Sequence, residues 1–317
     1  MKTRILGKNG PELSVIGLGT WAIGGPWAWG WGNQPTDSSE AAIKKSIETG
    51  INWIDTAPAY GLGHAEKVIG ACMSAEDKKS VLIATKCGLV WDKKKRIKIN
   101  LRPDSIRAEA EASLVRLGVD QIDIYQHHWP DKNVPIEDSW GEMVRLQQEG
   151  KIKYIGVCNY NAKQLEQCTR IAPVQSLQPP LSMLKREILL QTAPYCHKND
   201  IGIIAYSPLQ TGLLTGSFDI EKLAVDDWRR YDPFFKAPIF EKIMAFVSRL
   251  KEVSSGMDRS ASEAAIWWVL SQEGVTSAIT GARNSQQAES NGRIGAVNFS
   301  QDQMAAIDVL LEELPHL

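Results

Sequence analysis

Short apolar runs alternate along the chain with longer segments in which apolar residues recur at helical spacing. The runs predict eight strands, at residues 15–19, 51–55, 81–86, 122–126, 154–157, 174–177, 201–205 and 276–279. The periodic segments predict helices between them, at 37–50, 65–73, 103–117, 137–149, 161–171, 187–198, 239–254 and 261–271. Strands that alternate with helices in this way indicate right-handed βαβ units and a parallel sheet, and eight such units are the number that closes a barrel. We therefore predict an α/β fold, a (β/α)8 TIM barrel, and keep a doubly wound open sheet as the alternative.

Two local patterns near the start of the chain add detail. Lys8-Asn9-Gly10 separates the β-type segments 3–6 and 13–16, and an Asn-Gly pair tolerates the positive φ of a tight hairpin turn. We expect this N-terminal β-hairpin to cover one end of the barrel. Asp37 and Glu40 have the spacing of a capping box, which predicts the start of the first helix.

The composition indicates one folded domain without a strong charge excess. No linker divides the 317 residues, and α/β barrels commonly run past about 250 residues as a single domain. We predict one domain over residues 1–317. The 36 Lys and Arg balance 37 Asp and Glu, which argues against a nucleic acid or a membrane surface as partner. We interpret the basic cluster 93–96 as a solvated turn.

Location and metal binding can also be addressed from the sequence. The N-terminus has no apolar signal core and no run long enough to cross a bilayer, so we expect the protein in the cytoplasm. His127 and His128 are adjacent and lack the i, i+4 spacing of a helical metal site. The five cysteines form no C-x-x-C pair, which argues against a disulfide framework and a zinc site; they are Cys72, Cys87, Cys158, Cys168 and Cys196. We predict reduced thiols and no metal.

Polar residues follow the predicted strands, at the end of a barrel where active sites lie. They are Asp55 with Tyr60, Lys86, His128, Asn159, Gln178, Tyr206 with Ser207, and Gly281 with Arg283. A charged Asp55 at the end of a buried strand requires a partner, and Lys86 at the end of another strand is the candidate. Each residue alone has a purely structural explanation, such as an ion pair or a core histidine. The whole series indicates an active site.

Two glycine pairs resemble the start of a dinucleotide-binding fingerprint, but neither completes it. Gly17-Leu18-Gly19 and Gly61-Leu62-Gly63 are followed by Ala22 and Glu66 where the third glycine belongs. The phosphate-binding pattern G-x-x-x-x-G-K-[ST] is absent from the sequence. A Rossmann or P-loop site is therefore not predicted.

The chain resembles the aldo-keto reductases along nearly its whole length. The matching segments are GLGTW at 17–21, IDTAPAYGLGHAE at 54–66, ATK at 84–86, DIYQHHWP at 123–130, GKIKYIGVCNY at 150–160, AYSPLQTGLLTG at 205–216 and GARNSQQAESN at 281–291. The resemblance is greatest to the bacterial branch that includes glyceraldehyde and sugar reductases. It implies a (β/α)8 barrel that binds NADP(H) without a Rossmann fold and reduces aldehydes and ketones.

The resemblance also implies a catalytic set. Tyr60 is expected to be the general acid, Asp55 and Lys86 its supporting ion pair, and His128 the fourth member, which orients the carbonyl oxygen. The chemistry of these groups suits the roles, because an ammonium beside a phenol stabilises the phenolate. On that ground we expect the pKa of Tyr60 to fall from about 10 toward the working range.

For the cofactor, the resemblance implies carboxamide contacts from Asn159 and Gln178, a nicotinamide stacked on Tyr206, and a pyrophosphate loop after it. The expected NADP(H)-binding residues are Trp21, Asn159, Gln178, Tyr206, Ser207, Leu209, Gly212, Leu213, Thr215, Gly281, Arg283, Gln287 and Asn291. Arg283 is the candidate for the 2′-phosphate, because a guanidinium beside a helix N-terminus suits that anion. The chain departs from the family at Cys158, where Ser is frequent, and at Gln287 and Ser290, where many relatives have Arg and Glu.

Several tryptophans fall in or near the loops that follow the strands. Besides Trp21, the residues expected to wall a substrate pocket are Trp27, Trp29, Trp31, Trp91 and Trp129. Packing under a lid or contact with another subunit is the alternative, and the oligomeric state stays open. We expect the long segment 217–238 to lie over the cofactor.

Three functions are compatible with this pattern. The first is an NADP(H)-dependent reductase acting on a small carbonyl compound or a sugar. The second is a lyase that uses Lys86 as a Schiff-base nucleophile, which borohydride would trap with a carbonyl substrate. The third is a non-catalytic regulatory barrel that binds the cofactor with little turnover. The set Asp55, Tyr60, Lys86 and His128 favours the reductase.

Overall fold

Eight parallel strands form a closed barrel in the computed structural model, which describes residues 1–27, 30, 32–225 and 227–314. Going round the barrel the order is β3, β4, β5, β8, β9, β10, β11 and β12, and β12 pairs with β3 to close it. The strands are β3 (Ile16–Gly19), β4 (Trp53–Asp55), β5 (Leu82–Cys87), β8 (Ile122–His127), β9 (Ile152–Cys158), β10 (Ser176–Gln178), β11 (Gly202–Ala205) and β12 (Val275–Gly281). The predicted (β/α)8 barrel is confirmed, and the open sheet is wrong.

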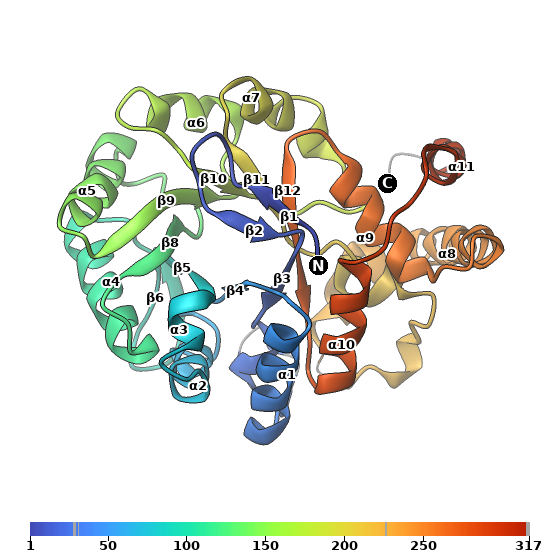
Figure 1. Ribbon diagram of the computed structural model, residues 1–317, viewed down its shortest axis with the longest axis horizontal. Helices are drawn as coiled ribbons and strands as arrows, with labels where there is room; N and C mark the ends of the chain where they lie inside the picture. The colour runs from blue at the N-terminus through green and yellow to red at the C-terminus, as the bar shows by residue number, and fades with distance from the viewer. Residues whose placement is uncertain (28–29, 31, 226, 315–317) are drawn as a thin grey trace.

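Helices surround the barrel (Figure 1). They are α1 (Thr36–Glu48), α2 (His64–Cys72), α3 (Asp77–Ser80), α4 (Pro103–Leu117), α5 (Ile136–Gln148), α6 (Ala162–Thr169), α7 (Thr192–Lys198), α8 (Ile239–Gly256), α9 (Ala261–Ser271), α10 (Ser285–Ile294) and α11 (Gln301–Glu312). Most of the predicted helices match these within a few residues. The sequence missed α3, and it missed a small antiparallel hairpin of β6 (Leu89–Trp91) and β7 (Ile97–Ile99) after β5. Elements of three or four residues are too short to show a period.

Two predicted helix starts are wrong. The first helix begins at Thr36, and its N-cap residue Pro35 makes no side-chain cap, so Asp37 lies inside the first turn and the predicted capping box is absent. There the carboxylate of Asp37 still faces the positive end of the helix dipole. The predicted helix 187–198 is a short 3₁₀ turn, η2 (Glu187–Leu189), followed by α7. Pro194 lies in the first turn of α7, where the missing N–H of proline costs no hydrogen bond.

The N-terminal hairpin of β1 (Thr3–Ile5) and β2 (Glu12–Ser14) closes the amino end of the barrel (Figure 1). Leu6 and Leu13 pack against a ring of barrel side chains, namely Trp53, Ala84, Ile124, Ile204 and Ile279. The turn differs from the prediction, because Gly7 has the positive φ, 60°, and Asn9 and Gly10 do not. A tight turn at Asn9-Gly10 would need an N–H from the next residue, and that residue is Pro11.

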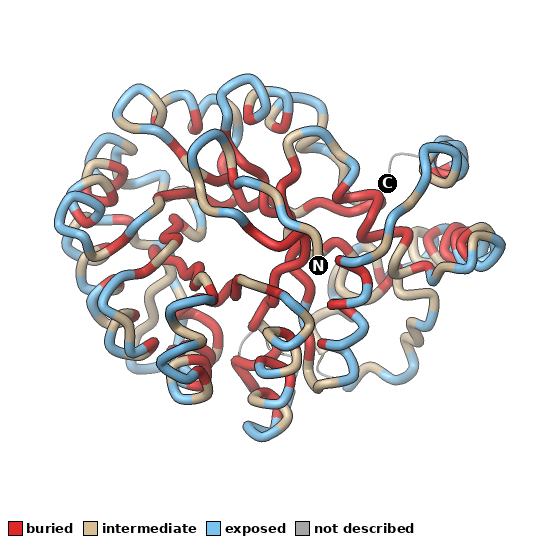
Figure 2. Tube along the Cα trace, viewed as in Figure 1, coloured by how far each residue is buried: buried red, intermediate tan, exposed pale blue. Residues whose placement is uncertain are grey.

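Side chains along each strand alternate between the barrel interior and the helical layer. In β8, Ile124 belongs to the inner cluster, whereas Tyr125 packs in the outer core between strands and helices. Burial accordingly runs along the strands and the inner faces of the helices (Figure 2). In β4 and β5, Trp53 and Ala84 point inward, so Asp55 and Lys86, two residues further on, also point inward at the carboxyl end of the barrel.

Candidate active site

A buried ion pair lies at the carboxyl end of the barrel. Lys86 Nζ donates hydrogen bonds to Oδ1 and Oδ2 of Asp55, both at 2.8 Å, and to the carbonyl oxygen of Thr56 at 2.8 Å. Gln178 Nε2 donates to Asp55 Oδ1 at 2.8 Å. Lys86 is fully buried, so its charge is stabilised by these oxygens and not by water. The predicted partner of Asp55 is confirmed.

The hydroxyl of Tyr60 completes this cluster. Lys86 Nζ donates to Tyr60 Oη at 3.2 Å, and only 6% of Tyr60 is exposed. Tyr60 lies in the turn between β4 and α2, where its backbone N–H donates to Ala57 O at 3.1 Å. Gly61 follows with φ of 64°, and a Cβ there would meet Gly24 O at 2.1 Å. Only glycine fits this close approach, and it fixes Tyr60 beside the loop after β3.

The pKa of Tyr60 is set mainly by burial. Burial raises the pKa of Tyr60 to about 12, Lys86 lowers it, and Asp55 raises it again. The expected fall of this pKa toward the neutral range is therefore wrong, because burial outweighs the effect of Lys86 and Asp55 opposes that effect further. Burial acts to lower the pKa of Lys86, but Asp55 and Tyr60 outweigh it and the pKa is raised. Tyr60 is a neutral phenol and Lys86 an ammonium at physiological pH.

His128 follows β8 and faces Tyr60 edge-on. The two ring centroids are 5.9 Å apart with an interplanar angle of 77°. The backbone N–H of His128 donates to Cys87 O at 2.9 Å, which fixes the residue against the end of β5. Burial and the nearby Lys86 charge hold the pKa of His128 well below its usual value, so the ring is neutral. Neither ring nitrogen bonds to another residue in the described part of the chain, and both are available to a ligand.

Two tryptophan rings contact the ring of Tyr60, and only that of Trp21 is stacked on it. Trp21 lies 6.0 Å from it between ring centroids at 23°, and Trp27 lies 5.9 Å from it at 37°. Trp228, in the 3₁₀ turn η5 (Trp228–Tyr231), stacks on the other rings through Trp21 at 6.3 Å and 20°. The sequence analysis missed Trp228 as a site residue. The signal was a large aromatic residue within the charged stretch DDWRRY.

The other predicted pocket residues are less closely placed. Trp91 ends β6 and is half-buried, and Trp129 is 42% exposed. Neither has a ring contact with Tyr60 among the described residues, and Trp29 and Trp31 lie outside them. The basic cluster 93–96 forms the exposed tip of the β6–β7 hairpin, where Arg96 pairs with Asp92. Its interpretation as a solvated turn is confirmed.

Asn159 connects the expected cofactor-binding amides to the rest of the site. Tyr206 Oη donates to Asn159 Oδ1 at 3.0 Å, and Asn159 Nδ2 donates to the carbonyl oxygen of His128 at 3.0 Å. Asn159 has φ of 63°, a conformation that asparagine tolerates better than most residues. Together with Gln178 on Asp55, these contacts place two side-chain amides and the phenol ring of Tyr206 near Asp55, Lys86 and His128.

The loop after β11 carries an unusual concentration of left-handed residues. Ser207, Gln210 and Thr211 have φ of 55°, 43° and 52°, and Gly212 has 106°. Non-glycine residues in this conformation cost about 1–3 kcal/mol each and cluster at ligand sites. Of the predicted contacts, Leu213 is fully buried and Leu209 packs on the core, so a ligand would reach these two through the backbone. Thr215 Oγ1 donates to Gly212 O at 2.7 Å.

Arg283 joins the loop before α1 to the loop before α10. Its Nε donates to Gln34 Oε1 at 3.0 Å and its terminal nitrogen to Asn33 O at 3.1 Å. Its backbone N–H donates to Gln287 Oε1 at 2.8 Å, and Asn291 Nδ2 donates to Gly281 O at 3.1 Å. Arg283 and Gln287 therefore lie at the N-terminal end of α10, where backbone N–H groups favour an anion, and Asn291 contacts Gly281 from further along the helix.

These residues fit a nicotinamide dinucleotide. The amides of Asn159 and Gln178 follow β9 and end β10, left-handed residues follow β11, and the Arg283 guanidinium lies between β12 and the N-terminus of α10. Within the described residues, no cluster of three or more His, Cys, Asp or Glu side chains is placed to hold a metal ion. The five cysteines are free thiols, and burial raises the pKa of Cys158. No described helix is long and apolar enough to span a membrane.

Comparison with known proteins gives matches over nearly the whole chain. Residues 15–312 match the model of the Aldo/keto reductase family. The aldo-keto reductase YhdN of Bacillus subtilis (strain 168) is 36% identical over 315 residues, 98% of this chain and 94% of that protein. The NADH-specific methylglyoxal reductase of Escherichia coli (strain K12) is 32% identical over 326 residues, 99% of each. Among solved structures, the glycerol dehydrogenase AKR11B4 from Gluconobacter oxydans matches with a TM-score of 0.90 and 37% identity over 99% of this chain and 96% of that one.

Proposed function

Because the chain belongs to the aldo/keto reductase family and is therefore a carbonyl-reducing oxidoreductase, we propose that it reduces small aldehydes and sugars to alcohols with NADPH, using Tyr60 as general acid. One observation carries the assignment of the acid. The hydroxyl of Tyr60 accepts a hydrogen bond from Lys86 Nζ at 3.2 Å, in a cluster whose positive charge Asp55 balances. A neutral phenol with a pKa of about 12 holds its proton until a carbonyl oxygen begins to take up negative charge.

The other groups act around that proton transfer. Bound nicotinamide supplies the hydride in this chemistry. Lys86 stabilises the phenolate that Tyr60 becomes when it gives up its proton, and Asp55 keeps Lys86 charged. The neutral ring of His128 donates a hydrogen bond to the same carbonyl oxygen and so orients it. Trp21 and Trp27 cover Tyr60 and keep water from the developing charge.

The ammonium state of Lys86 argues against the Schiff-base alternative. A lysine nucleophile needs a lowered pKa and a free amine. Here Lys86 binds both carboxylate oxygens of Asp55 and has a raised pKa. The lyase function is therefore not supported by the geometry.

Preference for NADPH over NADH is part of the proposal and depends on Arg283. The E. coli relative is named an NADH-specific enzyme, so family membership alone does not select the cofactor. Arg283 is the cation at the N-terminus of α10, and two of its nitrogens already hold residues 33 and 34. A 2′-phosphate there would gain a charge-assisted hydrogen bond from the remaining donors of the guanidinium.

Small substrates are favoured by the names of the relatives and by the aromatic cover over Tyr60. One relative is named for methylglyoxal and one solved structure for glycerol, both three-carbon compounds. A screen of NADPH and NADH oxidation with glyceraldehyde, methylglyoxal, aldose sugars and aromatic aldehydes tests the substrate class. Strict selectivity for a single ketone would contradict it.

Replacement of Tyr60 tests the general acid. Tyr60→Phe removes the proton and should reduce turnover by roughly 10²- to 10⁴-fold, the range for loss of a general acid. Cofactor binding, measured by quenching of protein fluorescence, should stay within about twofold, because no cofactor-binding role is proposed for the hydroxyl. Tyr231→Phe is the matched control, since Tyr231 is 71% exposed. Near-normal turnover of Tyr60→Phe would remove Tyr60 from the mechanism.

A further inference from the structure

An open cavity lies outside the barrel, between α9, α11 and the loop that precedes η2. Its volume is about 520 Å³, and none of its lining residues belongs to the candidate active site. It is lined by Arg186, Trp268, Ser271, Gln272, Met304, Asp308, Leu311 and Glu312. It is open to solvent, and its walls offer more polar than apolar surface, so polar groups of a ligand would make most of the contacts.

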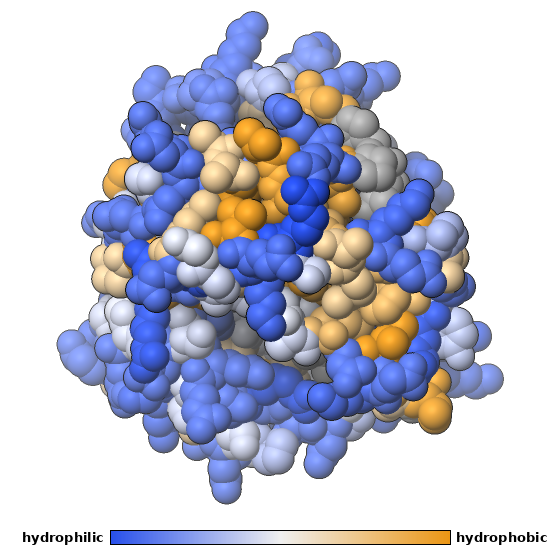
Figure 3. Space-filling model, turned by 90° about the vertical axis from the view of Figure 1, so that its right-hand side faces the viewer, coloured by the Kyte–Doolittle hydropathy of each residue, from blue (hydrophilic) through white to orange (hydrophobic). Residues whose placement is uncertain are grey.

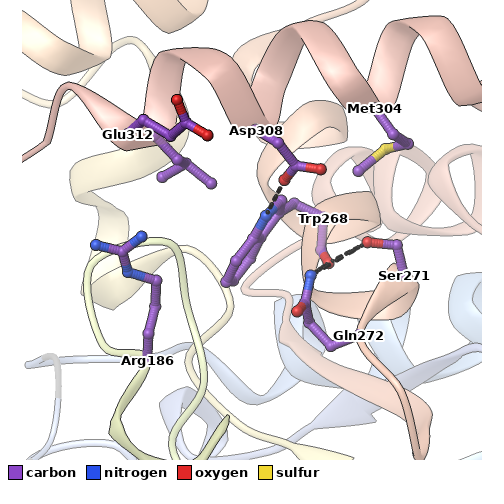
Figure 4. A pocket seen from close by; sticks show the side chains of 8 residues that line it. Arg186, Trp268, Ser271, Gln272, Met304, Asp308 and Glu312 are labelled. Carbon is purple, nitrogen blue, oxygen red and sulfur yellow. Dashed lines mark hydrogen bonds between the residues drawn. The ribbon is translucent and has the colours of Figure 1, made fainter. Parts of the chain in front are cut away.

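Helix α11 forms one wall with a single face. Met304, Asp308, Leu311 and Glu312 follow one another at helical spacing, so two carboxylates and two apolar side chains point to the same side. Trp268 of α9 forms the floor, and its Nε1 donates to Asp308 Oδ1 at 3.0 Å (Figure 4). This hydrogen bond fixes the carboxylate of Asp308 and leaves its second oxygen free to accept.

The hydrogen-bond donors of Ser271 and Gln272, on the α9 side of the cavity, already bind within the protein. Ser271 Oγ donates to Trp268 O at 2.7 Å, and Gln272 Nε2 donates to the same oxygen at 2.9 Å. The groups that remain are acceptors, Gln272 Oε1 and the carboxylates of α11. This wall therefore favours a ligand that brings hydrogen-bond donors and positive charge.

The opposite wall of the cavity offers positive charge and hydrogen-bond donors. Arg186 extends from the loop before η2 toward Glu312 (Figure 4). Neither side chain has a hydrogen-bond or ion-pair partner in the described part of the chain. Arg186 offers a planar set of N–H donors that matches a carboxylate. The face of the molecule that carries α8 and α11 shows apolar side chains between hydrophilic ones (Figure 3).

We propose that this cavity binds a small zwitterionic peptide, of dipeptide size and with apolar side chains. Its ammonium group would lie at Glu312 and Asp308, its carboxylate at Arg186, and its side chains against Met304, Leu311 and Trp268. A simple cation would leave Arg186 beside a like charge, and a simple anion would face two carboxylates. A ligand with both charges satisfies both walls.

Titration with leucyl-leucine by isothermal calorimetry tests the site. Acetylation of the amine and amidation of the carboxylate each remove one charge, and each should weaken binding roughly 10-fold or more, as expected for loss of a charge-assisted hydrogen bond. In Arg186→Gln, amidation of the peptide carboxylate should no longer weaken binding, whereas acetylation of its amine still should. In Glu312→Gln the reverse is expected. Arg102→Gln and Glu241→Gln are matched controls, because both positions are exposed and lie outside the cavity.

Three outcomes would overturn the proposal. The first is the absence of binding up to the solubility limit of leucyl-leucine. The second is equal binding of the doubly blocked peptide, which would mean that the charges are not recognised. The third is unchanged affinity in Arg186→Gln and Glu312→Gln, which would place the peptide elsewhere on the protein. Near-UV circular dichroism of each variant controls for folding.

Discussion

At the scale of single residues, burial holds the proton on Tyr60, and in the proposed reaction that proton leaves beside the charge of Lys86. The desolvation of Tyr60 is larger than the effect of Lys86 on its pKa, and Asp55 weakens that effect further. Burial therefore keeps the phenol protonated over the whole physiological range. The role of the ion pair in stabilising phenolate appears only when the proton leaves.

This arrangement predicts the pH dependence of catalysis. The acid form of Tyr60 is lost only as pH rises through about 12, so kcat/KM for aldehyde reduction should show no loss from this group between pH 7 and 10. Alcohol oxidation needs the phenolate, so its kcat/KM should rise by up to ~10-fold per pH unit over the same range. If kcat/KM for aldehyde reduction instead fell above about pH 8, Lys86 would lower the pKa of Tyr60 more than burial raises it.

Arg283 gives a second prediction at this scale. A charge-assisted hydrogen bond contributes about 1.5–3 kcal/mol, so Arg283→Ala should cut the preference for NADPH roughly 10- to 150-fold and leave NADH nearly unchanged. The measurement is kcat/KM with each cofactor. Arg283 also holds Gln34 and Asn33. Equal losses of kcat/KM with NADPH and NADH would therefore show that Arg283 supports the loop and does not bind the 2′-phosphate.

At the scale of elements, the turn between β4 and α2 positions Tyr60, the proposed acid, through a backbone contact. Gly61 has φ of 64°, and an added Cβ would lie 2.1 Å from the carbonyl oxygen of Gly24. Because the neighbour is backbone, it cannot move aside as a flexible side chain would. The loop after β3, which carries Trp21 and Trp27, and the turn that carries Tyr60 are thus built against each other.

Gly61→Ala should consequently damage both stability and activity. We expect the free energy of unfolding to fall by more than ~1 kcal/mol, from the left-handed conformation and the clash together, and turnover to fall because Tyr60 is displaced. Gly141→Ala is the control, since a Cβ there meets nothing within 4 Å and the position is inside α5. That change should stabilise the protein by ~0.5–1 kcal/mol. Urea denaturation and steady-state rates give both quantities, and an active, stable Gly61→Ala would refute the contact.

At the scale of the whole molecule, the two ends of the barrel have different tasks. The amino end is closed by the apolar side chains of Leu6 and Leu13, whereas the carboxyl end holds the polar cluster around Lys86. Changes at the closed end should therefore affect stability and leave chemistry intact, as is general for barrels.

Leu13→Ala tests this division. Leu13 is fully buried, so its truncation should lower the free energy of unfolding by about 2–5 kcal/mol. At temperatures where the variant is folded, its kcat/KM should match that of the wild type. Ile5→Ala in the same hairpin is the control, because Ile5 is 52% exposed and should cost less than ~0.5 kcal/mol. A large loss of kcat/KM in folded Leu13→Ala would show that the ends are coupled.

Local patterns determined much of this molecule. The alternation of strands and helices predicted the closed barrel. The position of Asp55, Lys86, Tyr60 and His128 after predicted strands indicated that they lie together at one end of it. These features can be predicted because the side-chain periods of strands and helices depend on neighbouring residues only. In addition, a parallel barrel brings the carboxyl ends of all its strands together. The pairing of Asp55 with Lys86 followed from the cost of a buried charge.

Other features depended on contacts between distant parts of the chain, which only the tertiary structure decided. Trp228 stacks on Trp21 across more than 200 residues, and Arg283 binds Gln34 across 249. The direction of the Tyr60 pKa shift depended on how deeply the phenol is buried, a property of the whole fold. The Asn-Gly turn failed because Pro11 has no N–H to close it, and the first capping box failed because the helix begins before Asp37, where Ser39 N–H donates to Pro35 O. Local patterns state what a residue can do, whereas packing decides which neighbours it meets and how much water is left around it.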